Sequence, residues 1–349
     1  MEPNDLGVSG EEVARQLRRS AVDRKGAEAA RSCDPRAVQP VGITGPGQHP
    51  VLPPGGHGVI APMHAASLLS RFLRYAAPIL LTFHAAGAAS RRSPALAPLS
   101  LDVAGLRREA RLHVPAGEGK MPAPVVFVFH GHGGSMANAA RSFALHAHWP
   151  EALVVYPQGL PTPGQLTDPE GRRAGWQSGA RSMGDRDLMF FDTLLAHLAK
   201  VHRVDRARVF ATGHSNGGGF TYLLWAQRGD QLTAIAPSGA AARRNLRNAR
   251  LQPLPVMHIA GRADPLVKFA WQEFTLATVR RVNGVAEEGT PWGGRKHAQI
   301  HKSESGTPLV TFIHPGGHRF PREAAPLIAI FFRDFAPPVT AEPATEADR

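Results

Sequence analysis

The sequence predicts an α/β protein with a mostly parallel, doubly wound sheet and helices on both of its faces. Between residues 105 and 337, runs of β-branched and aromatic residues alternate with segments of helical periodicity. The apolar runs are mostly continuous, as expected for strands that are covered on both faces. Glycine-rich turns follow two of these runs directly, and this order is typical of a parallel strand that leads into a helix.

The first half of this region contains three predicted strands and one predicted helix. Residues 108–115 alternate between polar and apolar side chains, which predicts a strand with one exposed face. Residues 123–131 and 152–159 are continuous apolar runs, typical of buried strands. Residues 135–149 lie between these two runs and have helical spacing.

A long stretch rich in proline and glycine, residues 159–187, follows. A structureless loop of this length within a compact domain is usually functional. The next segment, residues 187–201, predicts a helix, because five apolar side chains share one face: Leu188, Phe191, Leu194, Leu195 and Leu198.

The remaining elements continue the same alternation. We expect a strand over 207–212, a helix over 218–227, and further strands over 232–240, 254–261 and 308–317. A helix over 322–335 closes the domain, and residues 338–349 form a polar tail.

The N-terminal residues predict no part of the folded domain. Residues 1–62 are rich in Gly, Pro and Arg without apolar periodicity, so we expect disorder there. Residues 63–88 resemble a secretory signal peptide: Met63 opens the segment, Arg71 and Arg74 precede a short apolar run, and small residues follow at 86–88. We expect a linker over 89–104.

This layout predicts that translation starts at Met63 and that the protein is periplasmic or secreted. The alternative is a helix within an N-terminal extension of a cytoplasmic protein. The apolar run is too short to span a bilayer, so we expect no stable membrane anchor.

Composition restricts the classes of partner and site. The formal net charge is +12, which suits an anionic partner. The arginine-rich stretch 242–250 has no interleaved aromatic residues, however, so we expect no nucleic-acid partner. Cys33 is the only cysteine of the 349 residues, which excludes an intramolecular disulfide and a cysteine-based zinc site. The sequence does not indicate an oligomeric state.

Residues 213–219 read GHSNGGG and come directly after the strand predicted over 207–212. A serine between glycines at a sharp strand-to-helix turn is the pattern of a nucleophile elbow. The following helix N-terminus offers N–H groups and a favourable dipole to developing negative charge. We therefore predict Ser215 as a nucleophile.

A serine nucleophile requires a base and a group that orients the base. Asp264 and His318 each follow a predicted strand, and the carboxyl ends of parallel strands lie at one edge of a sheet. The chain order Ser, Asp, His is the one found in hydrolases whose serine lies on a nucleophile elbow. We predict Ser215, Asp264 and His318 as a catalytic triad.

The stretch HGHGGS, residues 130–135, follows the strand predicted over 123–131. Its glycines let the backbone approach the nucleophile, so we predict an oxyanion hole made of the main-chain N–H groups of His132 and Asn216. We expect His130 to be a structural hydrogen-bond donor at the end of its strand.

Other residues allow two interpretations. Trp176 is a candidate for substrate binding, and the alternative is that it anchors its loop to the core. Asp185, Asp187 and Asp192 fit helix capping and surface pairing better than the orienting role; Asp187 could also brace loops around the site. His314 and His318 have a plausible spacing for a zinc motif, but they flank Pro-Gly-Gly, so no helix aligns them and we predict no metal site.

Taken together, the motifs FHGHGGS, GWQSG, DRDLMFFDTLL, RVFATGHSNGGGFTY, HIAGRADPLV and HPGGHRFP resemble the polyhydroxybutyrate depolymerase and feruloyl-esterase-like branch of the α/β-hydrolases. The resemblance covers residues 109–335. It implies an extracytoplasmic carboxylic-ester hydrolase that uses Ser215, Asp264 and His318. His214 departs from the pattern, because similar sequences often carry a hydrophobic residue there.

The sequence therefore predicts a serine esterase with an α/β-hydrolase fold that needs no cofactor. The predicted substrates are short-chain or aromatic esters or hydroxyalkanoate oligomers. The alternatives are a serine peptidase of the same fold and a non-catalytic binding protein with that fold.

Overall fold

The computed structural model describes residues 96–116, 121–247 and 249–338, which all lie in one compact unit, Ala85–Arg349. The predicted disordered extension over 1–62 and the signal-peptide-like segment over 63–88 lie outside the described residues. So does the polar tail, apart from its first residue. None of the described helices has both the length and the apolar character needed to cross a membrane.

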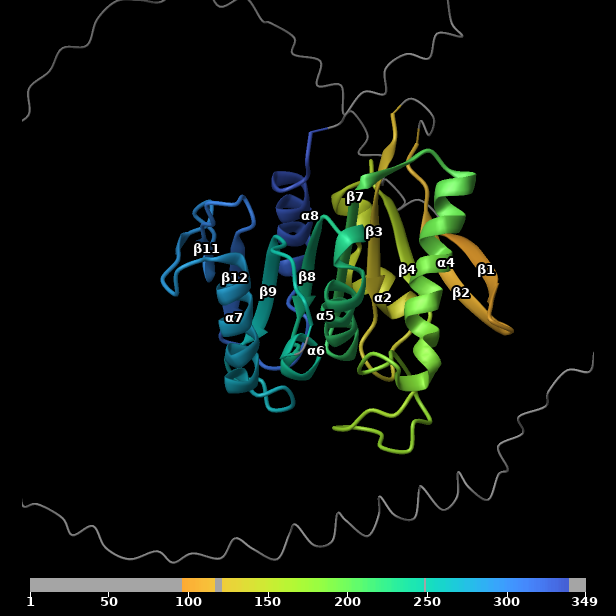
Figure 1. The fold of residues 1–349 in the computed structure, drawn as a ribbon, viewed down its shortest axis with the longest axis horizontal. Coiled ribbons are helices and arrows are strands. Elements are labelled where there is room, and N and C mark those ends of the chain that lie inside the picture. Colours follow the sequence, from red (N-terminus) through yellow and green to blue (C-terminus); the bar gives the residue numbers. More distant parts are fainter. Residues whose placement is uncertain (1–95, 117–120, 248, 339–349) are drawn as a thin grey trace, which may run out of the picture. The chain divides into compact units, whose positions relative to one another are not determined.

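Ten strands form one sheet, and its six central strands are parallel (Figure 1). In spatial order these are β4 (Leu153–Pro157), β3 (Ala123–Phe129), β7 (Val204–His214), β8 (Ala234–Ser238), β9 (Val256–Gly261) and β12 (Leu309–His314). Antiparallel strands complete both sides: β1 (Ala97–Val103) and β2 (Leu106–His113) beside β4, and β11 (Ala298–His301) and β10 (Thr290–Pro291) beside β12.

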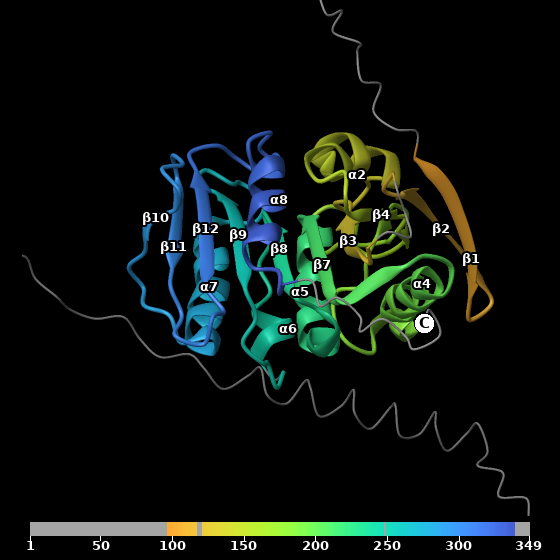
Figure 2. The same cartoon turned by 90° about the horizontal axis from the view of Figure 1, so that it is seen from above.

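Helices cover both faces of the sheet, as Figure 2 shows. One face carries α4 (Arg186–Val201), α5 (Asn216–Arg228), α6 (Arg243–Arg247) and α7 (Phe269–Asn283), and the other carries α2 (Met136–Phe143), α3 (Leu145–His148) and α8 (Ala324–Asp334). Each face has its own apolar core, with Phe191 and Leu223 in one and Phe210 and Phe332 in the other. The predicted α/β fold with a mostly parallel sheet is confirmed.

Most predicted elements match the structure. The five apolar residues of the helix predicted over 187–201 are all buried in α4. The single helix predicted over 135–149 is wrong, because Ala144 adopts a left-handed φ of 43° that separates α2 from α3. The stretch 159–187 is not structureless: it holds the paired strands β5 (Leu160–Pro161) and β6 (Ala174–Gly175) and a 3-10 turn, Ser182–Asp185.

The start of the domain requires a correction. The linker predicted over 89–104 is wrong for Ala97–Val103, and so is the boundary at residue 105, because β1 pairs with β2 along its whole length; residues 89–95 lie outside the described residues. The strand has six exposed or half-exposed residues of seven and carries Pro98, so it lacks the continuous apolar run that marks a buried strand. The sheet therefore extends one strand further than the sequence predicts on this side, and two strands further, β11 and β10, on the other.

Candidate active site

Ser215 lies at a sharp turn between β7 and α5. Its backbone has φ 57° and ψ −119°. Residues other than glycine rarely adopt this combination, and they do so mainly where the surrounding structure enforces it. The turn needs glycines on both sides. A Cβ at Gly213 would lie 2.5 Å from the carbonyl oxygen of Gly217, and one at Gly217 would lie 2.5 Å from that of His130. This is the strand–turn–helix geometry that a nucleophile elbow requires.

The structure brings the three predicted triad side chains together. The hydroxyl of Ser215 donates to Nε2 of His318 over 2.8 Å, and Nδ1 of His318 donates to Oδ2 of Asp264 over 2.7 Å. The other oxygen of Asp264 accepts the main-chain N–H groups of Leu266 and Val267. The three residues follow β7, β9 and β12, whose carboxyl ends share one edge of the sheet.

His214 lies against the ring of His318. The two ring centroids are 4.9 Å apart, and Nδ1 of His214 lies 3.1 Å from the hydroxyl of Ser238. Burial lowers the pKa of His214 to about 4, and the nearby His318 adds to this effect. His214 is therefore neutral at pH 7 and packs as an uncharged ring beside the predicted base. In the sequence, His214 stands out only because similar sequences often carry a hydrophobic residue before the serine.

The two predicted oxyanion donors lie beside the nucleophile. A Cβ at Gly131 would be 3.5 Å from Cβ of Ser215, so the turn that carries His132 runs close to the serine. The imidazole of His132 is already bonded: its Nε2 donates to the carbonyl of Thr162 over 2.8 Å. Among the described residues, no carbonyl accepts the main-chain N–H of His132. Asn216 begins α5, where N–H groups have no partner within the helix.

The structure corrects the prediction that Trp176 binds substrate. Its side chain is 0% exposed and packs between Phe129 and Phe220. Its indole N–H donates to the carbonyl of His130. The side chain of Asn216 holds the backbone of Trp176, because its oxygen accepts the N–H and its amide donates to the carbonyl. Trp176 therefore anchors the 159–187 stretch to the core, next to the nucleophile.

A buried ion pair, which the sequence analysis missed, holds the same stretch. Arg108 in β2 donates to Asp187 in α4 over 2.8 Å, and both side chains are inaccessible to solvent. The second oxygen of Asp187 accepts the N–H of Gln177. Asp187 thus braces a loop and does not cap its helix. The sequence contains one indication of this burial: side chains alternate between the two faces of β2, and Arg108 lies on the same, inward face as Ala110.

The other candidate carboxylates and histidines have structural partners. Asp192 pairs with Arg228 at 2.7 Å, and Asp185 accepts from the side chain of Gln177. His130 donates through Nδ1 to the carbonyl of Gly131 and accepts the N–H of Gly159. No group of three or more potential metal ligands occurs in the part of the chain that the structure describes.

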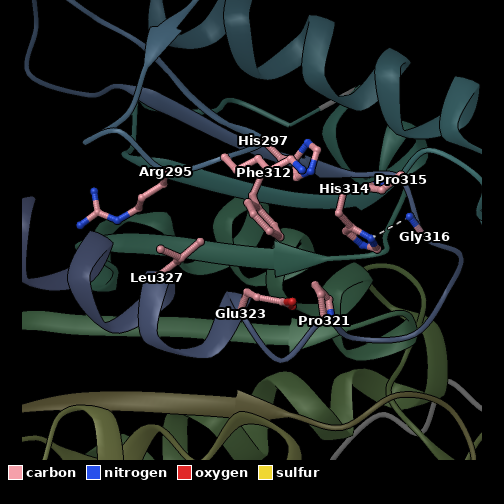
Figure 3. Close-up of a pocket in the computed structure, with 10 residues that line it drawn as sticks. Arg295, His297, Phe312, His314, Pro315, Gly316, Pro321, Glu323 and Leu327 are labelled. Carbon is pink, nitrogen blue, oxygen red and sulfur yellow. Dashed lines mark hydrogen bonds between the residues drawn. The ribbon is translucent and has the colours of Figure 1, made fainter. Parts of the chain in front are cut away.

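A cavity of about 540 Å³ is lined by residues at the end of β12, by residues 295–297 and by Leu327 of α8 (Figure 3). Phe312 and Leu327 form its apolar part, and His314 accepts the N–H of Gly316 at one end. His318 instead bonds to Ser215 and Asp264. His314 and His318, which the sequence analysis considered as a pair, therefore have different partners.

Several known proteins resemble the chain in sequence or in fold. No family model matches the chain. Feruloyl esterase C of Emericella nidulans is 27% identical over 225 residues, which cover 63% of this chain and 78% of that protein. NocK of Nocardia uniformis subsp. tsuyamanensis, assigned as an esterase, is 31% identical over 175 residues, and the match spans 48% of each protein.

Two solved structures share the fold at low sequence identity. An acetyl xylan esterase from Aspergillus awamori superposes with a TM-score of 0.51 at 13% identity, covering 67% of this chain and 98% of that one. An S-formylglutathione hydrolase from Agrobacterium tumefaciens gives a TM-score of 0.50 at 14% identity, covering 69% of this chain and 95% of the other. The fold is therefore that of the α/β-hydrolases, and the site contains the three side chains that serine hydrolysis requires. The proteins similar in sequence to the chain include several named as feruloyl esterases.

Proposed function

We propose that the protein is a serine carboxylic-ester hydrolase that works through an acyl-enzyme on Ser215. The observation that carries this proposal is the continuous path of hydrogen bonds from Ser215 through both ring nitrogens of His318 to Asp264. With Nδ1 protonated and bonded to the carboxylate, Nε2 is free to accept the serine proton. A neutral His214 beside the ring adds no competing positive charge.

The reaction follows from these positions. Ser215 Oγ attacks the ester carbonyl carbon while its proton passes to Nε2 of His318, and the carbonyl oxygen becomes an oxyanion. The N–H groups of His132 and Asn216 stabilise that charge. When the carbonyl re-forms, the alcohol leaves with the proton from His318. Water then attacks the acyl group, gives a proton to His318, and releases the acid as Ser215 regains its proton.

Labelling with a fluorophosphonate probe tests the nucleophile. We expect one adduct on Ser215 in the wild-type protein, and none in Ser215→Ala. Ser182→Ala is the matched control, because Ser182 bonds only to the loop residue Gly179, and it should label like the wild type. An adduct in Ser215→Ala, or no adduct in the wild type, contradicts the proposal.

For the substrate, we propose esters of hydroxycinnamic acids. The support is the set of relatives named feruloyl esterase, which match up to 63% of the chain. Acetyl and other short-chain esters and hydroxyalkanoate oligomers are the competing classes. We expect methyl ferulate to give the highest kcat/KM in a series that includes p-nitrophenyl acetate, p-nitrophenyl butyrate and a hydroxybutyrate dimer. Fastest turnover of the dimer overturns the substrate class but leaves the serine-hydrolase proposal intact.

A further inference from the structure

A series of buried polar side chains connects the helix after Ser215 with the loop that carries Asp264. Tyr222 in α5 donates its hydroxyl proton to Nδ1 of His258 in β9 over 2.8 Å. Nε2 of His258 donates to the side-chain oxygen of Gln272 in α7 over 3.1 Å. All three residues are 0% exposed. Hydrogen bonds inside the core therefore join α5 to both β9 and α7.

The bond between Gln272 and Val267 determines which group donates and which accepts in the other hydrogen bonds of the series. The amide nitrogen of Gln272 donates to the carbonyl of Val267 over 2.8 Å, so its oxygen is left to accept. His258 must then donate through Nε2 and accept at Nδ1. Burial lowers the pKa of His258 to about 4, so the ring is neutral at pH 7 and this tautomer carries no buried charge.

The series ends at the carboxylate of Asp264. Val267 lies in the loop between β9 and α7, and its N–H donates to Oδ1 of Asp264 over 2.9 Å. Its carbonyl accepts from Gln272, so this one residue is held on both sides. The remaining oxygen of Asp264 faces His318. Any shift of the loop therefore changes the direction in which the carboxylate meets the imidazole.

Apolar side chains of similar size could fill the same space without removing three polar groups from water. They could not, however, hold the carbonyl of Val267. We propose that Tyr222, His258 and Gln272 are positioning residues that keep the Asp264 loop, and through it the carboxylate, in line with His318. The inference rests on the proposed function, because it gives these residues a part in the same reaction.

Tyr222→Phe tests the network with the smallest change, because it removes only the hydroxyl. The chain offers a matched control in Tyr156, which is also 0% exposed and whose hydroxyl lies 2.8 Å from Nδ1 of His146 in the core of the opposite face. We expect both variants to unfold at lower urea concentration than the wild type. Only Tyr222→Phe should lower kcat, roughly tenfold and with unchanged KM, because misplacing a catalytic group slows the chemical step.

Gln272→Glu removes the donor to Val267 and keeps an acceptor for His258, so it should lower kcat at least as much. The same substitutions in an Asp264→Asn background should cause no further loss, because the network acts through Asp264. Unchanged kcat in Tyr222→Phe, an equal loss in Tyr156→Phe, or a full additional loss in the Asp264→Asn background overturns the inference.

A readout without turnover separates this inference from the proposed function. The proton on Nδ1 of His318 is observable by NMR in protein that carries ¹⁵N-labelled histidine. We expect it to exchange with solvent several-fold faster in Tyr222→Phe than in the wild type, and at the wild-type rate in Tyr156→Phe. Absence of ester hydrolysis in the wild type contradicts the proposed function alone, whereas equal exchange rates in all three proteins contradict the positioning role.

Discussion

Asp264 shows how a single side chain acquires its role from its neighbours. Two main-chain N–H groups hold one carboxylate oxygen, and the other oxygen is left for His318. Because the donors come from residues two and three positions later, the carboxylate is oriented by its own loop. The imidazole is thereby held in the tautomer that leaves Nε2 free to accept a proton.

Replacing Asp264 with Asn should therefore remove activity without unfolding the protein. An amide can donate to Nδ1, which favours the wrong tautomer of His318, and kcat should fall by about 10⁴ with little change in KM. Steady-state kinetics on p-nitrophenyl acetate measure both quantities. Asp192→Asn is the matched control: it removes a carboxylate that pairs with Arg228 near the surface, and it should stay within about twofold of the wild type.

The same residues show what the sequence could predict at this scale. Ser215, Asp264 and His318 were predictable because each follows a recognisable strand, and parallel strands end at one edge. The burial of Trp176 could not be predicted, because it depends on contacts with Phe129, Phe220 and Asn216, which come from other elements. A tryptophan in a glycine-rich stretch fits a pocket or a core equally well until its neighbours are known.

Among the elements, α5 and the turn that joins it to β7 set a strict requirement on sequence. The start of α5 runs so close to β3 that Gly217 faces the carbonyl of His130 without room for a Cβ. Gly219, two residues later in the same helix, has no atom within 4 Å of the position where its Cβ would be. The two glycines belong to the same run of three glycines but have opposite surroundings.

Alanine at these two positions should therefore have opposite effects. Gly217→Ala forces backbone shifts, which typically cost about 1–3 kcal/mol in a packed interior, and it displaces Ser215 so that labelling by fluorophosphonate slows. Gly219→Ala should stabilise the protein by up to about 1 kcal/mol, because alanine favours a helix more than glycine does. Urea unfolding of both variants gives the sign. Equal destabilisation would show that α5 tolerates no alanine in its first turn, contrary to this account.

Strands and helices differed in how well the sequence predicted them. The six parallel strands are buried on both faces, so each leaves a continuous apolar run. The outer strands β1, β10 and β11 are exposed or short, and their sequences resemble loops. Helix α7 was missed because only five of its fifteen residues are buried, so its apolar face is weak.

At the scale of the whole molecule, buried neutral histidines link stability to pH. The pKa of His214 and that of His258 are both lowered to about 4 by burial, from an ordinary value of 6.5. Below pH 6.5 the unfolded chain therefore binds more protons than the folded one, and folding is weakened as the pH falls toward 4. Above pH 6.5 neither state is protonated at these rings and the effect vanishes.

We therefore expect the free energy of unfolding to decrease between pH 6.5 and pH 4, by a few kcal/mol from these two rings, since one pKa unit corresponds to about 1.4 kcal/mol. Urea unfolding at several pH values measures this. His214→Leu should show a shallower decrease across that interval, because one of the two buried imidazoles is gone. An identical slope in the variant and the wild type would mean that His214 takes up its proton in the folded state as readily as in the unfolded one.

The network of Tyr222, His258 and Gln272 could not be predicted from the sequence. Each residue alone fits its own element, and nothing local indicates that Tyr222 and Gln272 meet across the same histidine. Such contacts depend on how α5 and α7 pack on neighbouring strands, which only the assembled sheet determines.

The strand order has a consequence during synthesis. β12 lies between β9 and β11 in the sheet, and His318 follows it, 103 residues after Ser215 and 54 residues after Asp264. A nascent chain on the ribosome thus contains the serine and the carboxylate before the imidazole that would activate them has been synthesised. In the proposed mechanism, Ser215 therefore gains its base only after β12 has joined the sheet.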